Sequence, residues 1–471
     1  MTWIIFSIAF CFYSGSIWLR HSWFQTSSWD LGIFDQATYL ISQGLPPNSS
    51  LLNFHILGDH GSLVLYPIGW LSILFPSVKL LFCLQGLALA STVFPLAEIA
   101  QKNNLSKKLT FTSLIVFLLY PVIFNVAIFD FHPEVLAVPL IMEFILLISY
   151  PKPKYHLRIF LCLLFTLTCK ITMSIFVFGI GFWIVAKNRR KLGITIISFS
   201  IIWFLLIGLI LIPSYGGGDS EITRHADKFG ISNFNIFIRN NFLENILIIF
   251  KQIFTLENIG YLFLLLIPVL YICFYKERKS FLFNLIPFSP LLFLNLISSI
   301  SPMKDLVHQY SLFLVPLIAS EVQFSLINLD NGFRVYPKWF SKRASKIILI
   351  WSILIFMIFS RITFFFGAFQ DRFDTVYARR EAISKIDTQS AVLTSNDLIP
   401  HLSRRKVIGI TSSENLDKLD IFDEVLLDRK HPGWNSNIEI VNSMIKKLEA
   451  NKYWYKKFEK GSVILFEKSS I

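Results

Sequence analysis

Ionisable residues gather in several short stretches of this chain, each beside a long apolar run. The candidates with a chemical role are Asp30, Asp35, Asp59, His60, Asp130, His132, Glu134, Lys170, Arg224, His308 and Tyr310. Placing an ionisable side chain beside a membrane-spanning segment costs free energy, so such residues tend to mark functional sites. Carboxylates and histidines suit general-base chemistry, and cations suit recognition of an anion such as a phosphate. The pattern predicts a site that removes a proton and holds a phosphate.

Each of these residues also has a simpler structural reading. Asp30 and Glu134 fit the preferences of helix starts, where a carboxylate caps or complements the first turn. Lys170 can extend its charged end to the membrane surface. Capping does not require both Asp130 and His132, so these two favour a functional role. Asp30, Asp130 and Glu134 are therefore the predicted catalytic residues, and the others are predicted to bind substrate.

A metal site and a solvent-exposed helix face are further alternatives at these positions. Asp59, His60 and His132 are candidate ligands for a divalent metal ion, although their spacing is not a metal-binding signature. Asp35 is as compatible with a solvated helix face as with a binding site. No cofactor is firmly predicted.

The elements that hold these residues are membrane helices. The chain has 471 residues, 54% hydrophobic and only 16% charged, whereas soluble domains carry about 25% charged residues. Five cysteines are too few for a disulfide-stapled scaffold. A helix needs about 20 apolar residues to cross a bilayer. About eleven spans are predicted, at roughly 3–19, 79–100, 109–128, 134–150, 157–169, 171–186, 192–212, 259–275, 281–299, 309–327 and 346–366.

The distribution of charge sets the orientation of these spans. With the N-terminus inside, the inner loops carry more than twice as many Lys and Arg as the outer segments, as the positive-inside rule requires. The net charge of +13 is then a topology signal. Outer loops 20–78 and 213–258 hold many of the candidate residues. Reading 157–186 as one span would break the charge pattern, so we expect two short helices there, around Lys170.

The last hundred residues differ in composition from the rest. Residues 370–471 have no long apolar run, and short β-rich pieces at 391–394, 407–410, 424–427 and 462–466 alternate with helical stretches. This alternation predicts a small α/β domain. An all-α membrane domain over 1–369 and an extracytoplasmic α/β domain over 370–471 are therefore expected. Residues 63–75 are expected to form a re-entrant or interfacial helix, and 243–254 a helix in the membrane plane.

Several motifs resemble a family of bacterial polytopic membrane proteins, domain of unknown function 2079. The run 29–36 (WDLGIFDQ), the pair at 59–60, the run 130–134 (DFHPE), Cys169 with Lys170, and the stretch 395–403 (SNDLIPHLS) carry the resemblance, which covers nearly the whole chain. Ile171 and Thr172 stand where an acidic pair is expected. The resemblance implies a bacterial inner membrane and no particular activity.

The layout is also similar to that of the C-type (GT-C) membrane glycosyltransferases, which include mannosyl- and aminoarabinosyltransferases. The similarity implies transfer of a sugar from a polyprenyl-phosphate donor to an acceptor at the outer face. Asp30 would be the base or the carboxylate that orients the acceptor, Asp130 or Glu134 a second acidic group, and Lys170 a phosphate contact. The residue types are themselves compatible with this reaction, and Arg224 and His308 are further candidates to stabilise the departing phosphate.

Two other functions are compatible with the sequence. A transporter or lipid flippase predicts ionisable residues near the bilayer midplane and two related halves; Glu143 and Glu321 are the candidates, and no paired halves are visible. A non-catalytic assembly protein would present the outer domain to a partner. Nucleic-acid binding is not expected, because no basic stripe lies on a soluble segment. The oligomeric state is not predicted.

Overall fold

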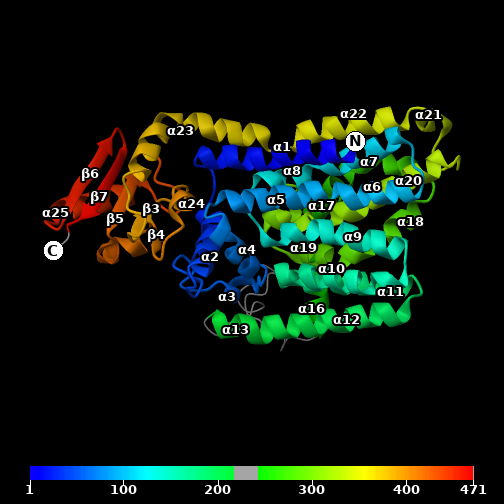
Figure 1. Ribbon diagram of the computed structural model, residues 1–471, viewed down its shortest axis with the longest axis horizontal. Helices are drawn as coiled ribbons and strands as arrows, with labels where there is room; N and C mark the ends of the chain where they lie inside the picture. Colours follow the sequence, from blue (N-terminus) through cyan, green and yellow to red (C-terminus); the bar gives the residue numbers. More distant parts are fainter. Residues whose placement is uncertain (217–241, 470–471) are drawn as a thin grey trace.

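Most of the chain is a bundle of helices with a β-sheet at one end (Figure 1). The computed structural model describes residues 1–216 and 242–469. Arg224 lies outside the described residues. The long helices run side by side along the longest axis of the molecule, and the C-terminal sheet lies beyond one end of them (Figure 1).

The helices of the bundle follow one another along the chain, and the connections between them differ in length. The first half contains α1 Thr2–Ser22, α2 Ile33–Ser42, α3 Leu57–His60, α4 Leu65–Leu74, α5 Lys79–Ser91, α6 Val93–Lys102, α7 Lys107–Leu118, α8 Pro121–Ile128, α9 Ala137–Ser149, α10 His156–Cys169, α11 Thr172–Ala186, α12 Arg190–Leu205 and α13 Ile212–Tyr215. The second half contains α16 Phe242–Ile253, α17 Leu256–Leu266, α18 Arg278–Phe283, α19 Ser289–Ile297, α20 Leu314–Asp330, α21 Lys338–Ser341, α22 Ala344–Phe359 and α23 Ile362–Ile383. The two short helices predicted around Lys170 are confirmed as α10 and α11.

By length and apolar composition, six helical stretches of the described chain qualify as membrane spans, or seven with a pair bent by 51°. The six are Thr2–Ser22, Lys79–Lys102, Arg190–Tyr215, Leu256–Phe274, Arg278–Ile297 and Ala344–Ile383, and the bent pair is α7 with α8. Helices α9, α10 and α11 have 13 to 15 residues, about 20 Å of rise against a hydrocarbon thickness of about 30 Å. The multi-span membrane fold is confirmed, and the number eleven stays a prediction.

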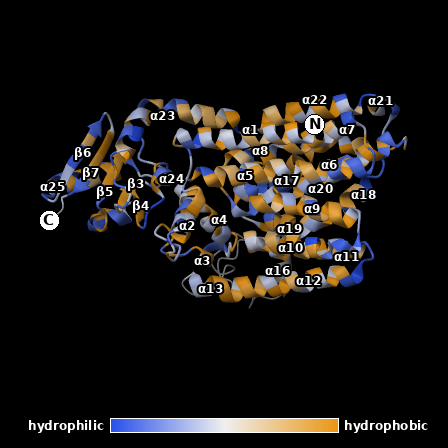
Figure 2. Cartoon of the chain, in the orientation of Figure 1, coloured by the Kyte–Doolittle hydropathy of each residue, from blue (hydrophilic) through white to orange (hydrophobic). Residues whose placement is uncertain are grey.

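The outer surface of the bundle is apolar, as a lipid-facing surface must be. Figure 2 shows hydrophobic residues along the outward sides of α12 and α22. Ile202 on α12 is 55% exposed, and Met357 on α22 is 69% exposed. A soluble protein rarely leaves such continuous apolar area in water. Inside, large aromatic side chains such as Phe117, Phe144 and Phe176 are almost completely buried and form the core between helices.

The C-terminal region forms a mixed five-stranded sheet. Its strands are β3 Val392–Thr394, β4 Ile408–Ile410, β5 Glu424–Asp428, β6 Trp454–Lys460 and β7 Val463–Lys468, in the order β4-β3-β5-β7-β6. Strand β3 pairs in parallel with β4 and β5, and β7 pairs antiparallel with β5 and β6. The predicted mixed α/β character is confirmed. Sequence analysis missed β6, whose exposed positions are mostly charged.

Helices cover both faces of this sheet. On one face, α25 Ile438–Ala450 packs the apolar side chains of Val441 and Met444 against the sheet. On the other face lie α23, the short α24 Ile399–Leu402 and Phe24 from the first loop. Helix α23 continues without a break through the predicted domain boundary at 369/370, and the division into 1–369 and 370–471 stays a prediction.

Candidate functional site

A tight turn after the first helix carries Asp30. The chain leaves α1 at Ser22 and forms one π-helical turn, Ser28–Gly32, before α2. The Ser27 side chain caps this turn by accepting a hydrogen bond from the backbone N–H of Trp29 at 3.3 Å. A Cβ on Gly32 would lie 2.9 Å from Ile399 of the C-terminal region, so only glycine fits here without a shift. The turn is therefore packed directly against the tail.

Asp30 is paired with His132, which comes from the loop between α8 and α9. The Asp30 carboxylate lies 3.4 Å from Nε2 of His132, and the side chains are 34% and 5% exposed. Nδ1 of His132 is 2.8 Å from the backbone oxygen of Asp130 and donates to it, which turns Nε2 toward Asp30. The backbone N–H of His132 donates to Gln85 of α5 at 3.2 Å. The imidazole is thus fixed on both sides.

This pairing shifts the titration of both groups. Burial disfavours the charged imidazolium, but the carboxylates of Asp30 and Glu134 outweigh burial, and the pKa of His132 lies above its ordinary value. Burial alone would raise the pKa of Asp30, yet the nearby charges of His132, Lys170 and Arg20 hold it below its ordinary value. Asp30 is therefore a carboxylate, and His132 is biased toward the charged form.

The Asp130 side chain is buried, and both of its carboxylate oxygens accept hydrogen bonds. One oxygen accepts a hydrogen bond from Nη1 of Arg20 at 2.6 Å, and the other accepts from the backbone N–H of Ser27 at 2.8 Å. Arg20 is 6% exposed and Asp130 is 0% exposed. Arg20 also lies over the ring of Phe129, 5.2 Å from its centroid. Through Ser27, Asp130 holds the start of the turn that carries Asp30.

A third pair joins Glu134 to Lys170 at the break between α10 and α11. Nζ of Lys170 donates to Oε1 of Glu134 at 3.1 Å, and both residues are buried. The charges of Lys170 and His132 outweigh burial and lower the pKa of Glu134, while Glu134 raises that of Lys170 despite burial. The second carboxylate oxygen of Glu134, Oε2, is buried and has no hydrogen-bond partner among the described residues. It is an acceptor that lacks a donor.

The predicted binding residues Asp59, His60 and Tyr310 lie around the Lys170 break. The backbone oxygen of His60 accepts a hydrogen bond from the N–H of Ile171 at 3.1 Å, which fixes α3 beside the break. Nε2 of His60 is 3.5 Å from the Asp59 carboxylate. Tyr310 is close enough for the charge of Lys170 to act on its phenol, although burial is stronger and raises its pKa.

Two other predicted residues are engaged elsewhere. His308 pairs with Asp305 at 2.7 Å, and its ring meets Phe129 edge-on at 5.5 Å; Phe129 also stacks on His132, with the ring centroids 5.9 Å apart. Asp35 is 1% exposed and accepts hydrogen bonds from Ser403 and Arg404 of the tail. Its observed partners make Asp35 a contact between the first loop and the tail rather than a neighbour of Asp30.

The tail makes further contacts with the first loop through one asparagine. Oδ1 of Asn396 accepts hydrogen bonds from the backbone N–H of Ser28 at 3.1 Å and from the Ser28 hydroxyl. Gln36 donates to the backbone oxygens of Arg405 and Lys406, at 3.3 Å each. The turn of Asp30 is therefore held from one side by Asp130 and from the other by the tail.

Within the described chain, no group of three or more His, Cys, Asp or Glu side chains is arranged to hold a metal ion. Asp59, His60 and His132 thus do not form the divalent-metal site considered from sequence. Sequence analysis also missed the roles of Arg20 and Gln85. A signal existed for Arg20, since an arginine directly after a long apolar run is costly to bury and favours an ion-pair partner.

Three ion pairs thus meet at one end of the bundle: Asp30–His132, Arg20–Asp130 and Lys170–Glu134. Asp30 is the most exposed of these six side chains, because the other five are 11% exposed or less. The arrangement can offer a solvent-accessible carboxylate as a proton acceptor, beside a lysine cation and an unpaired carboxylate oxygen. Such a set suits the displacement of an anionic leaving group.

The fold is similar to that of two solved structures of ArnT from Cupriavidus metallidurans. The structure bound to undecaprenyl phosphate aligns with a TM-score of 0.57 at 10% identity, over 98% of this chain and 97% of that one. The apo structure aligns with a TM-score of 0.51 at 9% identity, over 94% and 95%. No curated protein matches the chain by sequence.

A family model covers residues 20–464, which include every residue of the three ion pairs. This match bears out the resemblance found in the motifs of the first loop, the 130–134 run and the tail. The chain belongs to the family described as predicted membrane protein (DUF2079), and it is an integral multi-pass membrane protein.

Proposed function

We propose that this protein transfers a sugar from a polyprenyl-phosphate donor to a hydroxyl of an acceptor, with Asp30 as the base. The observation that carries the proposal is the partly exposed Asp30 carboxylate, fixed by His132 beside the Lys170–Glu134 pair. The ArnT-like fold supports it, since ArnT binds undecaprenyl phosphate in one of the similar structures. We further propose a bacterial inner membrane, with the N-terminus inside and the site and tail outside.

Asp30 has the geometry and charge that a base requires. It is ionised at neutral pH because its pKa is lowered, and its exposure lets an acceptor hydroxyl approach. In the proposed step the acceptor oxygen bonds to the anomeric carbon of the sugar while the bond from that carbon to the phosphate oxygen breaks. The hydroxyl proton passes to Asp30, and the electron pair leaves with the polyprenyl phosphate. One displacement inverts the configuration at the sugar.

Lys170 and Glu134 can contact the two groups that are joined by the breaking bond, the phosphate and the sugar. The Lys170 ammonium is the cation placed to stabilise the phosphate as its charge grows. The orphan oxygen of Glu134 needs a donor, and a sugar hydroxyl supplies one. Asp130 has both oxygens engaged, which favours a positioning role over proton transfer.

An apolar cavity near this position suits the lipid chain of the donor. It has a volume of about 360 Å³ and lies between α11, α12 and α19, lined by Ser174, Ile175, Phe178, Ser200, Ile201, Phe204, Pro290, Phe293 and Leu294. Ser174 is one helical turn beyond Lys170. A phosphate at Lys170 would leave its prenyl chain free to enter this cavity, where burial of apolar surface stabilises it.

The test measures sugar transfer by the full-length protein in liposomes supplied with a panel of radiolabelled polyprenyl-phosphate sugars. We expect Asp30→Asn to lower the rate by at least 100-fold, in the range of general-base contributions of about 10²–10⁴. The exposed tail carboxylate Asp371 provides the matched control, and Asp371→Asn is expected to leave the rate unchanged.

Full activity of Asp30→Asn would refute the assignment of the base. Movement of intact lipid donor across the bilayer, with no sugar transferred by the wild type, would instead favour the flippase. If neither transfer nor movement occurs with any donor while the protein binds a partner through its tail, the assembly function is favoured.

A further inference from the structure

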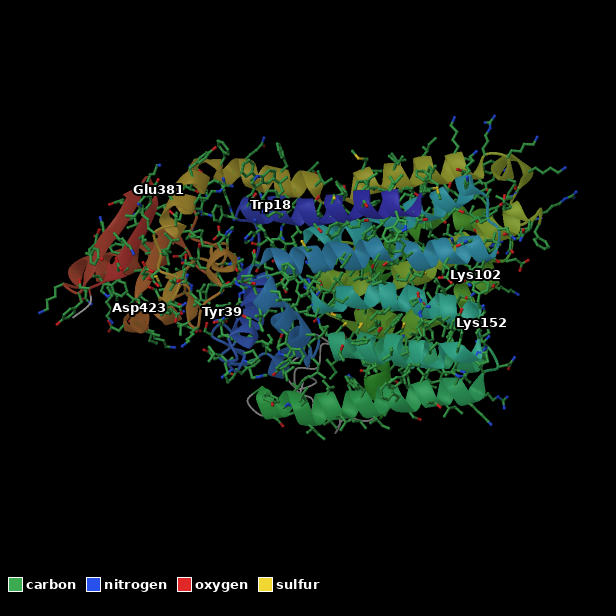
Figure 3. The ribbon with its side chains drawn as sticks, in the orientation of Figure 1. Trp18, Tyr39, Lys102, Lys152, Glu381 and Asp423 are labelled. Carbon is green, nitrogen blue, oxygen red and sulfur yellow. The ribbon has the colours of Figure 1, made fainter. Side chains whose placement is uncertain are left out.

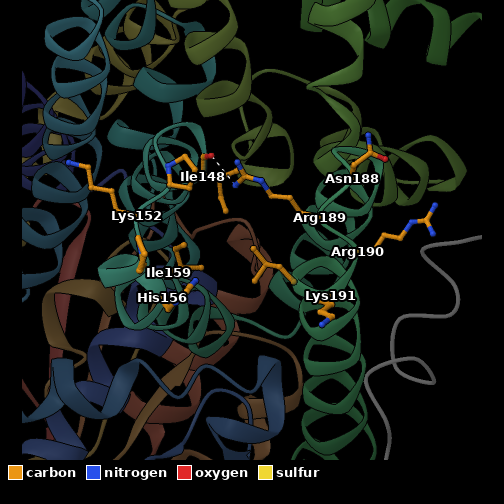
Figure 4. A pocket seen from close by; sticks show the side chains of 11 residues that line it. Ile148, Lys152, His156, Ile159, Asn188, Arg189, Arg190 and Lys191 are labelled. Atoms are coloured by element: carbon orange, nitrogen blue, oxygen red, sulfur yellow. Dashed lines mark hydrogen bonds between the residues drawn. The ribbon is translucent and has the colours of Figure 1, made fainter.

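A basic pocket lies at the end of the bundle away from the tail. Its volume is about 600 Å³, and it lies between the segment joining α9 to α10 and the turn joining α11 to α12 (Figure 4). The lining residues are Ile148, Pro151, Lys152, Pro153, His156, Ile159, Asn188, Arg189, Arg190, Lys191 and Leu192. Figure 3 shows Lys152 at this end, whereas Glu381 and Asp423 lie at the other. The pocket is therefore remote from Asp30.

The charge of this pocket is not neutralised by the residues that surround it. Four of the lining residues are Lys or Arg and none is acidic. Lys152, Arg190 and Lys191 are exposed and form no ion pair with a described residue. Arg189 donates from Nη1 to the backbone oxygen of Ile148 at 3.2 Å (Figure 4), which fixes one cation across the pocket. The ion pair between Arg158 on α10 and Glu143 on α9 does not line the pocket.

Backbone polarity adds to this positive charge. Helix α10 begins at His156 and α12 begins at Arg190, so both present their N-termini to the pocket. Neither start has a side chain that accepts a hydrogen bond from its first backbone N–H groups. The N–H of His156 already donates to the backbone oxygen of Pro153, so the two helix dipoles, together with the first N–H groups of α12, favour an anion. They reinforce the cluster of cations at the same place.

The floor and the flanks of the pocket are apolar. Ile148, Ile159 and Leu192 line it, and the adjacent outward faces of the two helices expose Leu157 at 67% and Ile194 at 57%. A ligand with an anionic head and hydrocarbon chains can place the head among the cations and the chains along these faces. A small soluble anion would use only the first of these features.

We propose that this pocket binds the phosphate group of an anionic membrane lipid from the leaflet at the basic end of the bundle. Basic pockets between membrane helices bind such headgroups by charge and by hydrogen bonds to phosphate oxygens. The proposal does not depend on the proposed transferase activity. It makes the pocket a lipid site separate from the one around Lys170.

The test is binding of a fluorescent phosphatidylglycerol to the full-length protein in neutral detergent, with phosphatidylcholine as the uncharged comparison. The triple variant Lys152→Gln, Arg190→Gln, Lys191→Gln removes three cations and keeps Arg189. Each cation near a membrane surface is worth about 1 kcal/mol, or about a fivefold change in affinity, so the loss of three should lower the affinity for phosphatidylglycerol on the order of 100-fold. Phosphatidylcholine binding should not change.

A second triple variant has the same composition of changes at the same end of the molecule. Lys338→Gln, Lys342→Gln and Arg343→Gln removes three exposed cations that do not line the pocket. We expect wild-type affinity from it. Leu192→Trp, which fills part of the pocket without changing charge, should also weaken phosphatidylglycerol binding, and it keeps the test decisive if the first triple variant does not fold.

Equal loss in the two triple variants would overturn the proposal, because it would assign binding to the overall charge of this face. Unchanged binding in Leu192→Trp would overturn it as well. If excess inorganic phosphate at constant ionic strength displaces the lipid completely, the pocket is a site for soluble phosphate, and the lipid assignment is wrong.

Discussion

Replacing Asp130 by Asn should destabilise the protein far more than the same change at Asp30. Asn keeps the size of the side chain and an accepting oxygen, but it leaves the Arg20 guanidinium, which is 6% exposed, without its counter-charge. Breaking a buried ion pair by removing one partner costs about 3–5 kcal/mol. The Asp30 pair with His132 is partly exposed, and its loss should cost about 1 kcal/mol or less.

These free energies translate into different unfolding temperatures. A change of 1 kcal/mol in the free energy of unfolding shifts the midpoint of thermal unfolding by about 2–4 °C in domains of 150–250 residues. For this longer chain we use the lower value, about 2 °C per kcal/mol. Asp130→Asn should therefore lower the unfolding temperature by roughly 5–10 °C, and Asp30→Asn by about 2 °C or less. The measurement is thermal unfolding of the full-length protein in detergent, followed by tryptophan fluorescence.

A double-mutant cycle isolates the pair. Arg20→Met alone leaves Asp130 buried and uncompensated, whereas Arg20→Met with Asp130→Asn removes both charges. The double variant should be more stable than the sum of the single effects predicts, by about 2 kcal/mol or more. If the single effects simply add, or if Asp130→Asn unfolds within 2 °C of the wild type, the two residues do not act as a buried ion pair.

Two further predictions concern the environment of Asp30. His132→Gln removes the imidazolium that lowers the pKa of Asp30, so burial should then raise that pKa, and the acid limb of the pH–activity profile should move to higher pH; an unmoved limb would contradict the role of His132. Asn396→Ala removes the acceptor for the N–H of Ser28, and should lower kcat by about tenfold with little change in KM, since an unsatisfied buried donor costs about 1–3 kcal/mol. Asn396→Asp keeps the accepting oxygen and should retain most of the activity, and a loss equal to that of alanine would refute this reading.

Local patterns in the sequence predicted most of the elements but not how they bend. The β-rich pieces of the tail correspond to strands β3, β4, β5 and β7 because alternation and flanking polar residues are local signals. The apolar run 109–128 is instead two helices bent by 51°, since Pro121 begins a new helix after Tyr120. A hydropathy value averaged over the whole run does not detect the bend.

Of the six residues in the three ion pairs, all except Arg20 could be identified from the sequence, but their pairing could not. Asp30, Asp130 and Lys170 stand beside apolar runs and were visible as costly charges. Their pairing depends on contacts between distant segments, such as Arg20 with Asp130, which no single sequence encodes locally. The same limit applies to Asp35, whose hydrogen bond from Ser403, 368 positions away, has no local signal in the sequence; its role as a substrate contact stays a prediction.

The tail contacts also have a consequence for biosynthesis. Ser28 and Asn396, which bond to each other, are 368 positions apart. A ribosome adds about 5–20 residues per second, so the first loop emerges roughly 20–70 seconds before the segment that holds it. During that interval the turn of Asp30 lacks its second support. The second support of this turn therefore forms only late in synthesis, and a chain that ends before Asn396 keeps the contact of Ser27 with Asp130 but lacks the contacts with the tail.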